Sequence, residues 1–227
     1  MKKYTTLLFD SDNTLLDFTR SEANGLRDTL AANNITYTEE IRALYSSIND
    51  SFWKSFERGE IKKEEIYTGR FKKLLDTLGV DCDAKKVALT YEDKLGSYHF
   101  LLDGAWETLE VLRSRGYDLH IVTNGNQKIQ NRRLNDSGII NLVNKVFVSE
   151  AVGAPKPEKE YFDFVFANIK EKDKSKILII GDSLTSDIKG GINAGIDTCF
   201  YNRKGKTSDV KPTYEIENIT DLIKMLD

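Results

Sequence analysis

Hydrophobic and polar positions follow two different patterns along this chain. Between about residues 18 and 100, apolar side chains recur at the three- and four-residue spacing of an amphipathic helix, and no run typical of a strand occurs. Gly59 and Gly79 interrupt this pattern, and Thr38 followed by Glu39 and Glu40 indicates the start of a helix. Residues 17–100 are therefore predicted to form an all-helical domain.

The rest of the chain alternates short apolar runs with helical patterns. Strands are predicted at 117–122, 145–148, 176–180 and 198–201, and helices at 105–115, 127–137, 157–169 (with Pro157 in the first turn) and 186–194. The apolar run at 4–9 is expected to join the same sheet. Such alternation indicates parallel crossovers with helices on both faces. The predicted fold is α/β, a doubly wound, Rossmann-like parallel sheet formed by residues 1–16 and 101–227, into which the helical domain is inserted.

Composition narrows the class of protein. The chain has 227 residues, 40% of them hydrophobic, which is enough for a full core. Its 33 basic and 36 acidic residues nearly cancel, so a nucleic acid polymer is not an expected partner. Cys82 and Cys199 form no zinc-binding or disulfide pattern. Asp10 interrupts the first apolar run too early for a signal peptide, and no run reaches the roughly 18 apolar residues of a membrane span, so we expect no membrane partner and a cytoplasmic location.

Polar clusters follow four of the predicted strands. Each cluster alone fits a turn or a helix cap. Ligands of open parallel sheets bind beyond the carboxyl ends of the strands, so four clusters in succession predict one shared site. The clusters are Asp10-Ser11-Asp12-Asn13-Thr14, Thr123-Asn124-Gly125-Asn126, Ser149-Glu150 with Lys156, and Gly181-Asp182 with Asp187.

The residue types of these clusters favour phosphoryl transfer. Clustered carboxylates need a cation, and hard oxygen ligands favour Mg²⁺ together with a substrate phosphate. Lys156 and the donors of Thr123, Asn124 and Gly125 are candidates for binding that phosphate. Asp10 is placed to attack phosphorus and form an aspartyl phosphate, and Asp12 to act as general acid and base.

The four clusters, in this order, resemble the motifs of the haloacid dehalogenase superfamily over the whole chain. The resemblance implies that Asp10 is the nucleophile, that Asp12 is the general acid/base, and that Thr123 and Lys156 bind the phosphate. It also implies Mg²⁺ held by Asp10, the Asp12 carbonyl and Asp182, with Asp187 in support, and a helical insertion that acts as a cap. Asn13 stands where many members carry glycine, but asparagine tolerates left-handed backbone. Superfamily dehalogenases lack the second acid, so Asp12 favours turnover to free phosphate.

The segments 181–188 and 190–196, with Ser149-Glu150 and 156–158, resemble more narrowly the bacterial YjjG/YfnB group. This implies 5'-nucleotidase activity, chiefly on pyrimidine nucleoside monophosphates. A phosphosugar, phosphoglycolate or another small phosphate ester remains an alternative substrate, and a phosphomutase an alternative enzyme. A non-catalytic protein that binds a phosphorylated ligand is an alternative of another class.

Substrate choice is expected to rest on the helical domain. Trp53 is a candidate for stacking on a nucleobase and Arg70 for binding a sugar or phosphate oxygen, with Phe52, Phe56 and Arg58 as weaker candidates. The spacing of Phe52 and Phe56 equally fits a core stripe. His99 and His120 fall in no motif and are expected to be structural. Hinges are expected at residues 15–17 and 101–104, where the chain passes between the two patterns.

Overall fold

The computed structural model describes residues 3–203, 205–207 and 209–227. The chain divides into two compact units, Met1–Phe18 with His99–Asp227, and Thr19–Tyr98. The sequence places the corresponding boundaries at 16/17 and 100/101. Residues 1, 2, 204 and 208 of the predicted core lie outside the description. The naming of these units as catalytic core and cap stays a prediction.

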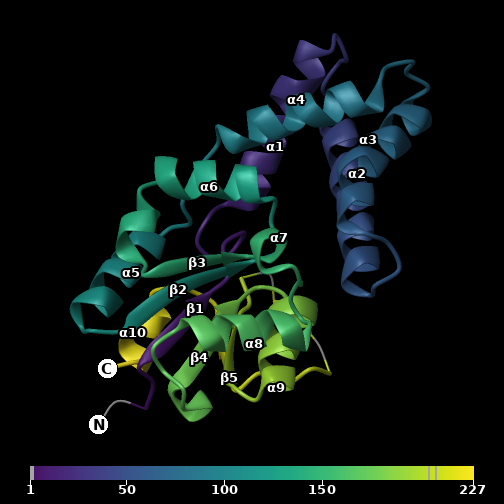
Figure 1. The fold of residues 1–227 in the computed structure, drawn as a ribbon. Helices are drawn as coiled ribbons and strands as arrows, with labels where there is room; N and C mark the ends of the chain where they lie inside the picture. The colour runs from purple at the N-terminus through teal and green to yellow at the C-terminus, as the bar shows by residue number, and fades with distance from the viewer. Residues whose placement is uncertain (1–2, 204, 208) are drawn as a thin grey trace. The chain divides into compact units, whose positions relative to one another are not determined.

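The first unit contains a parallel sheet, as predicted (Figure 1). Its strands are β1 (Thr6–Phe9), β2 (Asp118–Thr123), β3 (Lys145–Val148), β4 (Ile177–Gly181), β5 (Asp197–Tyr201) and β6 (Tyr214–Ile216). They lie in the order β3-β2-β1-β4-β5-β6, and every neighbouring pair is parallel. The five predicted strands are confirmed with ends shifted by at most two residues, whereas β6 was not predicted.

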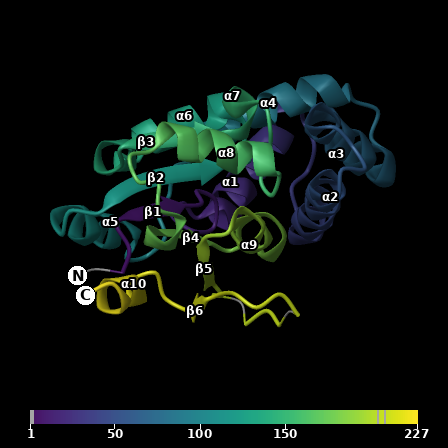
Figure 2. The ribbon, with the colours of Figure 1, turned by 60° about the horizontal axis from the view of Figure 1, so that its bottom comes forward.

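Helices cover both faces of this sheet (Figure 2). They are α5 (Ala105–Ser114), α6 (Gln127–Asp136), α7 (Ser149–Val152), α8 (Lys159–Asn168), α9 (Lys189–Ala194) and α10 (Asp221–Met225), with short helical turns η1 (Ile139–Leu142), η2 (Lys174–Lys176) and η3 (Leu184–Ile188). Alternate residues of β1 point to opposite faces: Leu7 and Phe9 pack with α5, α6 and α10, while Leu8 packs with α8 and α9. The doubly wound arrangement is therefore confirmed.

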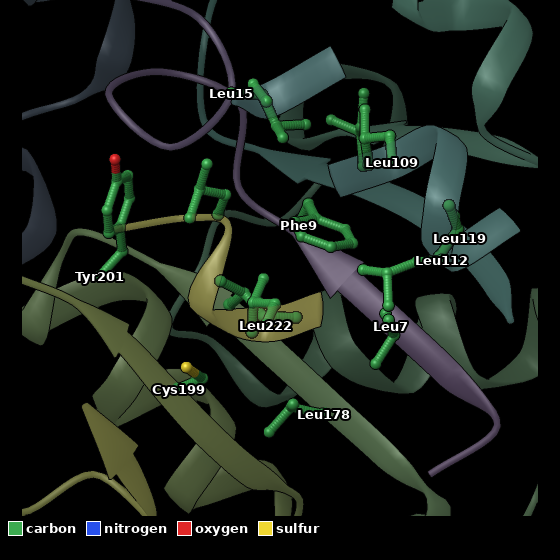
Figure 3. Packing of buried hydrophobic residues seen from close by; sticks show 14 of the residues in the cluster. Leu7, Phe9, Leu15, Leu109, Leu112, Leu119, Leu178, Cys199, Tyr201 and Leu222 are labelled. Carbon is green, nitrogen blue, oxygen red and sulfur yellow. The ribbon is translucent and has the colours of Figure 1, made fainter. Parts of the chain in front are cut away.

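One face of the sheet forms the larger hydrophobic cluster (Figure 3). Leu7 and Phe9 lie at its centre and are fully buried. Burial of one such side chain stabilises the fold by about 1.5–3 kcal/mol. The labelled neighbours are Leu15, Leu109, Leu112, Leu119, Leu178, Cys199, Tyr201 and Leu222. This packing fixes the position of β1, and thereby of the residues that follow Phe9.

Two predicted helices begin differently in the structure. The helix expected from Pro157 begins at Lys159, because residues 155–158 form a turn in which the Glu158 N–H donates to the Pro155 carbonyl (2.9 Å) and Glu158 keeps an extended backbone. The Lys156–Pro157 peptide bond is cis. The helix expected from Ser186 begins earlier, as the π-helical turn η3, and continues as α9.

The second unit is helical, as predicted. Within residues 19–98, all of which the structure describes, no strand occurs. Its helices are α1 (Phe18–Ala32), α2 (Glu39–Glu57), α3 (Lys63–Leu78) and α4 (Ala84–Gly96), the first of which begins one residue before the unit boundary. Thr38 caps α2 as expected, since its hydroxyl accepts from the Ile41 N–H (3.3 Å), and Gly79 ends α3 with a left-handed backbone.

Two further expectations are tested by the structure. None of the helices formed by the described residues has the length and apolar composition that a bilayer span needs. Both cysteines are free, with Cys199 buried and Cys82 half-buried.

Candidate active site

Lys156 lies at the centre of the polar residues that follow the strands. Its Nζ donates to Asp10 Oδ1 (2.6 Å), to Asp187 Oδ1 (2.7 Å) and to the Val122 carbonyl (2.7 Å), which uses all three of its protons. The side chain of Lys156 is 1% exposed. The ends of β1 and β2 and the turn η3 are thus joined through one buried ammonium group.

Negative charge exceeds positive charge around this lysine. Carboxylate oxygens of Asp10, Asp182 and Asp187 lie within 4.8 Å of one another. Burial raises the pKa of Asp10 well above its ordinary value; Lys156 opposes this shift, and Asp187 and Asp182 add to it. Burial alone would lower the pKa of Lys156, but the charges of Asp10 and Asp187 raise it. Three hard oxygen donors with an excess of negative charge fit a divalent cation such as Mg²⁺.

Asp187 is oriented by the turn in which it lies. Its Oδ1 accepts from Lys156 and its Oδ2 from the Ser183 N–H (3.1 Å), and its side chain is fully buried. Gly181 leaves the space for it, because a Cβ at position 181 would lie 2.2 Å from Asp187 Oδ2. Asp182 is more accessible, and its carbonyl accepts from Lys206 Nζ (3.2 Å).

The end of β2 and the loop after it fix the backbone of Lys156. The Asn124 side chain donates to the Lys156 carbonyl (2.8 Å) and accepts from the Lys156 N–H (2.8 Å). The Thr123 hydroxyl accepts from the Gly125 N–H (3.0 Å). The amide of Asn124 is therefore engaged in fixing the loop that carries Lys156, and the assignment of Asn124 and Gly125 to phosphate binding stays a prediction.

Asp12 comes directly before Asn13, whose left-handed φ of 60° agrees with the tolerance expected of asparagine. Its carboxylate accepts from Gln130 Nε2 (2.5 Å) and from Arg133 Nη1 (2.5 Å), both on α6. Asp12 does not belong to the carboxylate group formed by Asp10, Asp182 and Asp187. The two acids of the first motif thus have different surroundings.

Sequence reasoning missed the two α6 residues that contact Asp12. Gln130 and Arg133 are 1% and 0% exposed. Their three-residue spacing, on the same side of the helix as the apolar Ile129 and Leu134, is the signal by which they could have been found. A buried arginine is costly unless hydrogen bonds or an opposite charge compensate it, and Asp12 provides both for Arg133.

The predicted substrate residues of the helical unit differ in accessibility. Trp53 is partly exposed and packs edge-to-face on Phe56, with ring centroids 5.9 Å apart. Arg70 is only 4% exposed, donates to Asn49 Oδ1 (2.7 Å) and lies over the Tyr91 ring, 4.9 Å from its centroid. Phe52 packs against Gly69 of α3.

Arg58, the last weaker candidate, is exposed, and the two histidines expected to be structural differ in burial. Arg58 forms an exposed ion pair with Glu60 (2.5 Å). His120 is buried inside β2, where its Nε2 lies 3.1 Å from Asp118 Oδ2, and His99 is exposed. Burial lowers the pKa of His120.

The two predicted hinge segments run side by side within the first unit. The Asp17 N–H donates to the Phe100 carbonyl (2.8 Å), and the Leu102 N–H donates to the Leu15 carbonyl (2.9 Å). Leu16 and Leu101 form an antiparallel bridge between them. Their role as hinges stays a prediction.

Three proteins of known name are similar to this chain over nearly its whole length. YfnB of Bacillus subtilis is 42% identical over 228 residues, which cover 100% of this chain and 97% of YfnB. The pyrimidine 5'-nucleotidase PynA of Streptococcus pneumoniae is 38% identical, with 99% of this chain and 95% of PynA covered. The pyrimidine 5'-nucleotidase YjjG of Escherichia coli is 30% identical, with 99% and 98% covered.

The fold is also found in a solved structure. A crystal structure of YfnB from Bacillus subtilis bound to magnesium superposes with a TM-score of 0.95 at 42% identity, covering 100% of both chains. A family model of haloacid dehalogenase-like hydrolases matches residues 4–195, which include Asp10, Asp12, Thr123, Lys156 and Asp187. The chain belongs to the haloacid dehalogenase-like hydrolase family.

Proposed function

We propose that this protein is a Mg²⁺-dependent phosphomonoesterase that hydrolyses pyrimidine nucleoside monophosphates through an aspartyl-phosphate intermediate. The observation that carries the proposal is the buried ammonium of Lys156 between Asp10 and Asp187, beside Asp182. A nucleophilic carboxylate in this surrounding is held close to groups that compensate a phosphate dianion. The helical unit is proposed as the cap that selects the substrate.

Asp10, Asp182 and the Asp12 carbonyl are the proposed Mg²⁺ ligands, with Asp187 in support. When bound, Mg²⁺ would neutralise these carboxylates and attract the oxygens of the phosphate. The excess of carboxylates over ammonium groups supports this assignment. The relative YfnB, whose crystal structure contains magnesium, supports it as well.

In the first half-reaction, a carboxylate oxygen of Asp10 attacks phosphorus, and the bond from phosphorus to the ester oxygen breaks. Asp12, in its acid form, gives its proton to that oxygen, so the nucleoside leaves as an alcohol. Thr123 and Lys156 are proposed to act on the phosphate, Thr123 as a hydrogen-bond donor and Lys156 through its positive charge, because its three protons are already donated. The product of this step is phosphorylated Asp10 beside an ionised Asp12.

In the second half-reaction, Asp12 accepts a proton from a water molecule whose oxygen attacks the same phosphorus. The bond between phosphorus and the Asp10 carboxylate oxygen breaks, which releases inorganic phosphate. Asp10 returns as a carboxylate and Asp12 as an acid. Both residues are thereby restored for the next substrate.

The substrate class rests on the relatives. Two of them, PynA and YjjG, are pyrimidine 5'-nucleotidases. Trp53, which is partly exposed, is proposed to stack on the base. Arg70 is proposed to contact the sugar or phosphate, although its burial makes it the weaker candidate. We thus propose that the enzyme acts on a small phosphate ester. We also propose a cytoplasmic location for it.

The test is phosphate release from a panel of esters, with and without Mg²⁺. The panel contains uridine, cytidine and thymidine monophosphates, purine nucleoside monophosphates, a hexose phosphate, phosphoglycolate and 4-nitrophenyl phosphate. We expect the fastest release from the pyrimidine nucleotides and loss of release on chelation. A nucleotide rate no better than the median ester contradicts the nucleotidase proposal.

The Asp10→Asn variant tests the mechanism. We expect a loss of at least about 1,000-fold in kcat, because the amide cannot form the acyl phosphate. Asp163→Asn, an exposed change on α8, is the matched control and should keep full activity. Full activity in Asp10→Asn would refute the nucleophile assignment. If the unsubstituted protein converts its substrate into a single rearranged phosphate ester without releasing phosphate, it is instead a mutase.

A further inference from the structure

Asp12 contacts two buried polar side chains that the proposed reaction does not use. Gln130 and Arg133 donate from α6 to different oxygens of its carboxylate, Oδ2 and Oδ1, both at 2.5 Å. Polar side chains this deeply buried are costly unless they are hydrogen-bonded. Their common partner is the residue proposed to move the proton in both half-reactions.

Gln130 has a defined orientation because both ends of its amide are engaged. Its Oε1 accepts from the Ser11 hydroxyl (3.0 Å), so its Nε2 faces Asp12. Ser11 lies between Asp10 and Asp12 in sequence and is fully buried. The amide therefore links the backbone turn that carries both acids to one chosen oxygen of Asp12.

Gly125 provides the space that Gln130 occupies. A Cβ at position 125 would lie 2.3 Å from Gln130 Nε2 and 2.7 Å from its Cγ. Even the smallest side chain at this position would therefore displace the amide from Asp12. This gives Gly125 a reason to be glycine that is independent of phosphate binding.

Arg133 completes the arrangement with a charge. Its side chain is 0% exposed, and its guanidinium lies 5.7 Å from the centroid of the Phe18 ring. Hydrogen bonds between ionised groups are about twice as strong as neutral ones. A carboxylate has about four lone pairs, so two such bonds fix its rotation and leave lone pairs for a proton.

We propose that Gln130 and Arg133 are positioning residues that fix the rotation of the Asp12 carboxylate for proton transfer. The absence of a side chain at Gly125 leaves the space that Gln130 needs for this role. This inference rests on the role proposed above for Asp12. Both residues donate to the carboxylate of Asp12, so we propose that they act through it.

The dependence on the leaving group tests this proposal. An alkyl ester such as uridine monophosphate needs a proton on its leaving oxygen, whereas 4-nitrophenolate leaves without one. For Gln130→Met we expect kcat/KM on the nucleotide to fall about 10- to 100-fold, part of the 10²- to 10⁴-fold that general acid catalysis supplies. The fall on 4-nitrophenyl phosphate should be less than about threefold, since no proton is required there.

Matched controls lie on the same helix. Gln127→Met and Arg132→Met change exposed residues of α6 and should leave both substrates unaffected. Gly125→Ala should reproduce the leaving-group pattern of Gln130→Met. Arg133→Lys keeps the charge but not the planar donor, and should show the same pattern more weakly.

Two outcomes overturn the proposal while leaving the proposed function intact. One is an equal loss on both esters in Gln130→Met, which indicates a structural role; the other is no loss on either. If the unsubstituted protein releases phosphate from no ester, the proposed function fails and this inference fails with it. Unfolding curves of each variant show whether a lost activity reflects a lost fold.

Discussion

Two buried arginines, one in each unit, have contrasting partners. Arg133 in the sheet-containing unit donates to the carboxylate of Asp12, while Arg70 in the helical unit donates to the neutral Asn49 and lies among the rings of Tyr45, Phe71 and Tyr91. The first holds an acid that follows a strand. The second, on α3, contacts Asn49 of α2 and the Tyr91 ring of α4. Burial of a charged group alone therefore does not distinguish a contact between helices from a contact at the proposed catalytic acid.

The largest effect is expected when Lys156 loses its charge. Lys156→Met leaves Asp10 and Asp187 buried without their ammonium partner, which should lower the free energy of unfolding by about 3–5 kcal/mol. Urea unfolding without Mg²⁺ measures this change. Because the carboxylates remain, added Mg²⁺ should recover part of the loss.

The control for Lys156→Met is Lys159→Met on α8, which removes an exposed, solvent-screened ion pair with Asp163 and should leave the unfolding curve nearly unchanged. If Lys156→Met lowers the free energy of unfolding as little as this control does, the carboxylates around Lys156 are solvated like surface groups. The polar residues at the strand ends would then not be a buried site.

A smaller effect is expected for Arg70→Met. Loss of the hydrogen bond to Asn49 and of the contact with the Tyr91 ring should lower the free energy of unfolding by about 2–3 kcal/mol. The KM for uridine monophosphate should rise if Arg70 contacts the substrate as proposed, and should change less than about threefold if Arg70 only packs between helices. Arg58→Met, which removes an exposed ion pair, is the stability control.

A change in KM without a change in stability for Arg70→Met would alter the comparison between the two buried arginines. A large rise in KM for nucleotides, with normal stability, would assign Arg70 to the substrate despite its burial. The helical unit would then contain a polar site as functional as the one beside the strands.

The smallest effect concerns Glu22 of α1, which accepts from Ser46 (2.6 Å) and Asn49 (2.9 Å). Burial raises the pKa of Glu22 above its ordinary value. The folded state then binds a proton more tightly than the unfolded chain, so this residue's contribution to stability is greatest below pH 4 and is lost as the pH rises through the raised pKa.

Glu22→Gln should remove this pH dependence, so the stability of the variant should fall less as the pH rises from 4 to 7. The measurement is the difference in unfolding free energy between the unsubstituted protein and Glu22→Gln at several pH values. Glu40→Gln is a control of opposite sign, because the Thr38 side chain lowers the pKa of Glu40 by hydrogen bonding. Differences that run the same way in both variants would contradict the assignment.

Much of the fold could be predicted because buried parallel strands are continuous apolar runs, as at 177–180. The edge strand β6 could not be predicted, because it has three residues and only Ile216 among them is buried. The start of α8 was misplaced because a proline that fits a first helical turn equally fits the turn before it.

The acids and the lysine of the site could be predicted from topology, which brings the ends of parallel strands together. The contacts of Asp12 were missed, because α6 is polar around most of its surface and the spacing of Gln130 and Arg133 beside Ile129 and Leu134 is a weak signal. Arg132 and Arg133 are adjacent in sequence, yet one is exposed and the other fully buried. Arg132 pairs with Asp136 on the helix surface, and only packing decides which of the two arginines reaches Asp12.

Gly125 leaves room for the side chain of Gln130, and Gly181 leaves room for the side chain of Asp187. An alanine scan would therefore rank both among the residues most damaging to turnover, although neither contributes a side chain to the reaction. Transplanting only the acids, the lysine and the threonine onto another sheet would omit these two glycines and the space that they leave. The transplanted groups would then be present but misoriented.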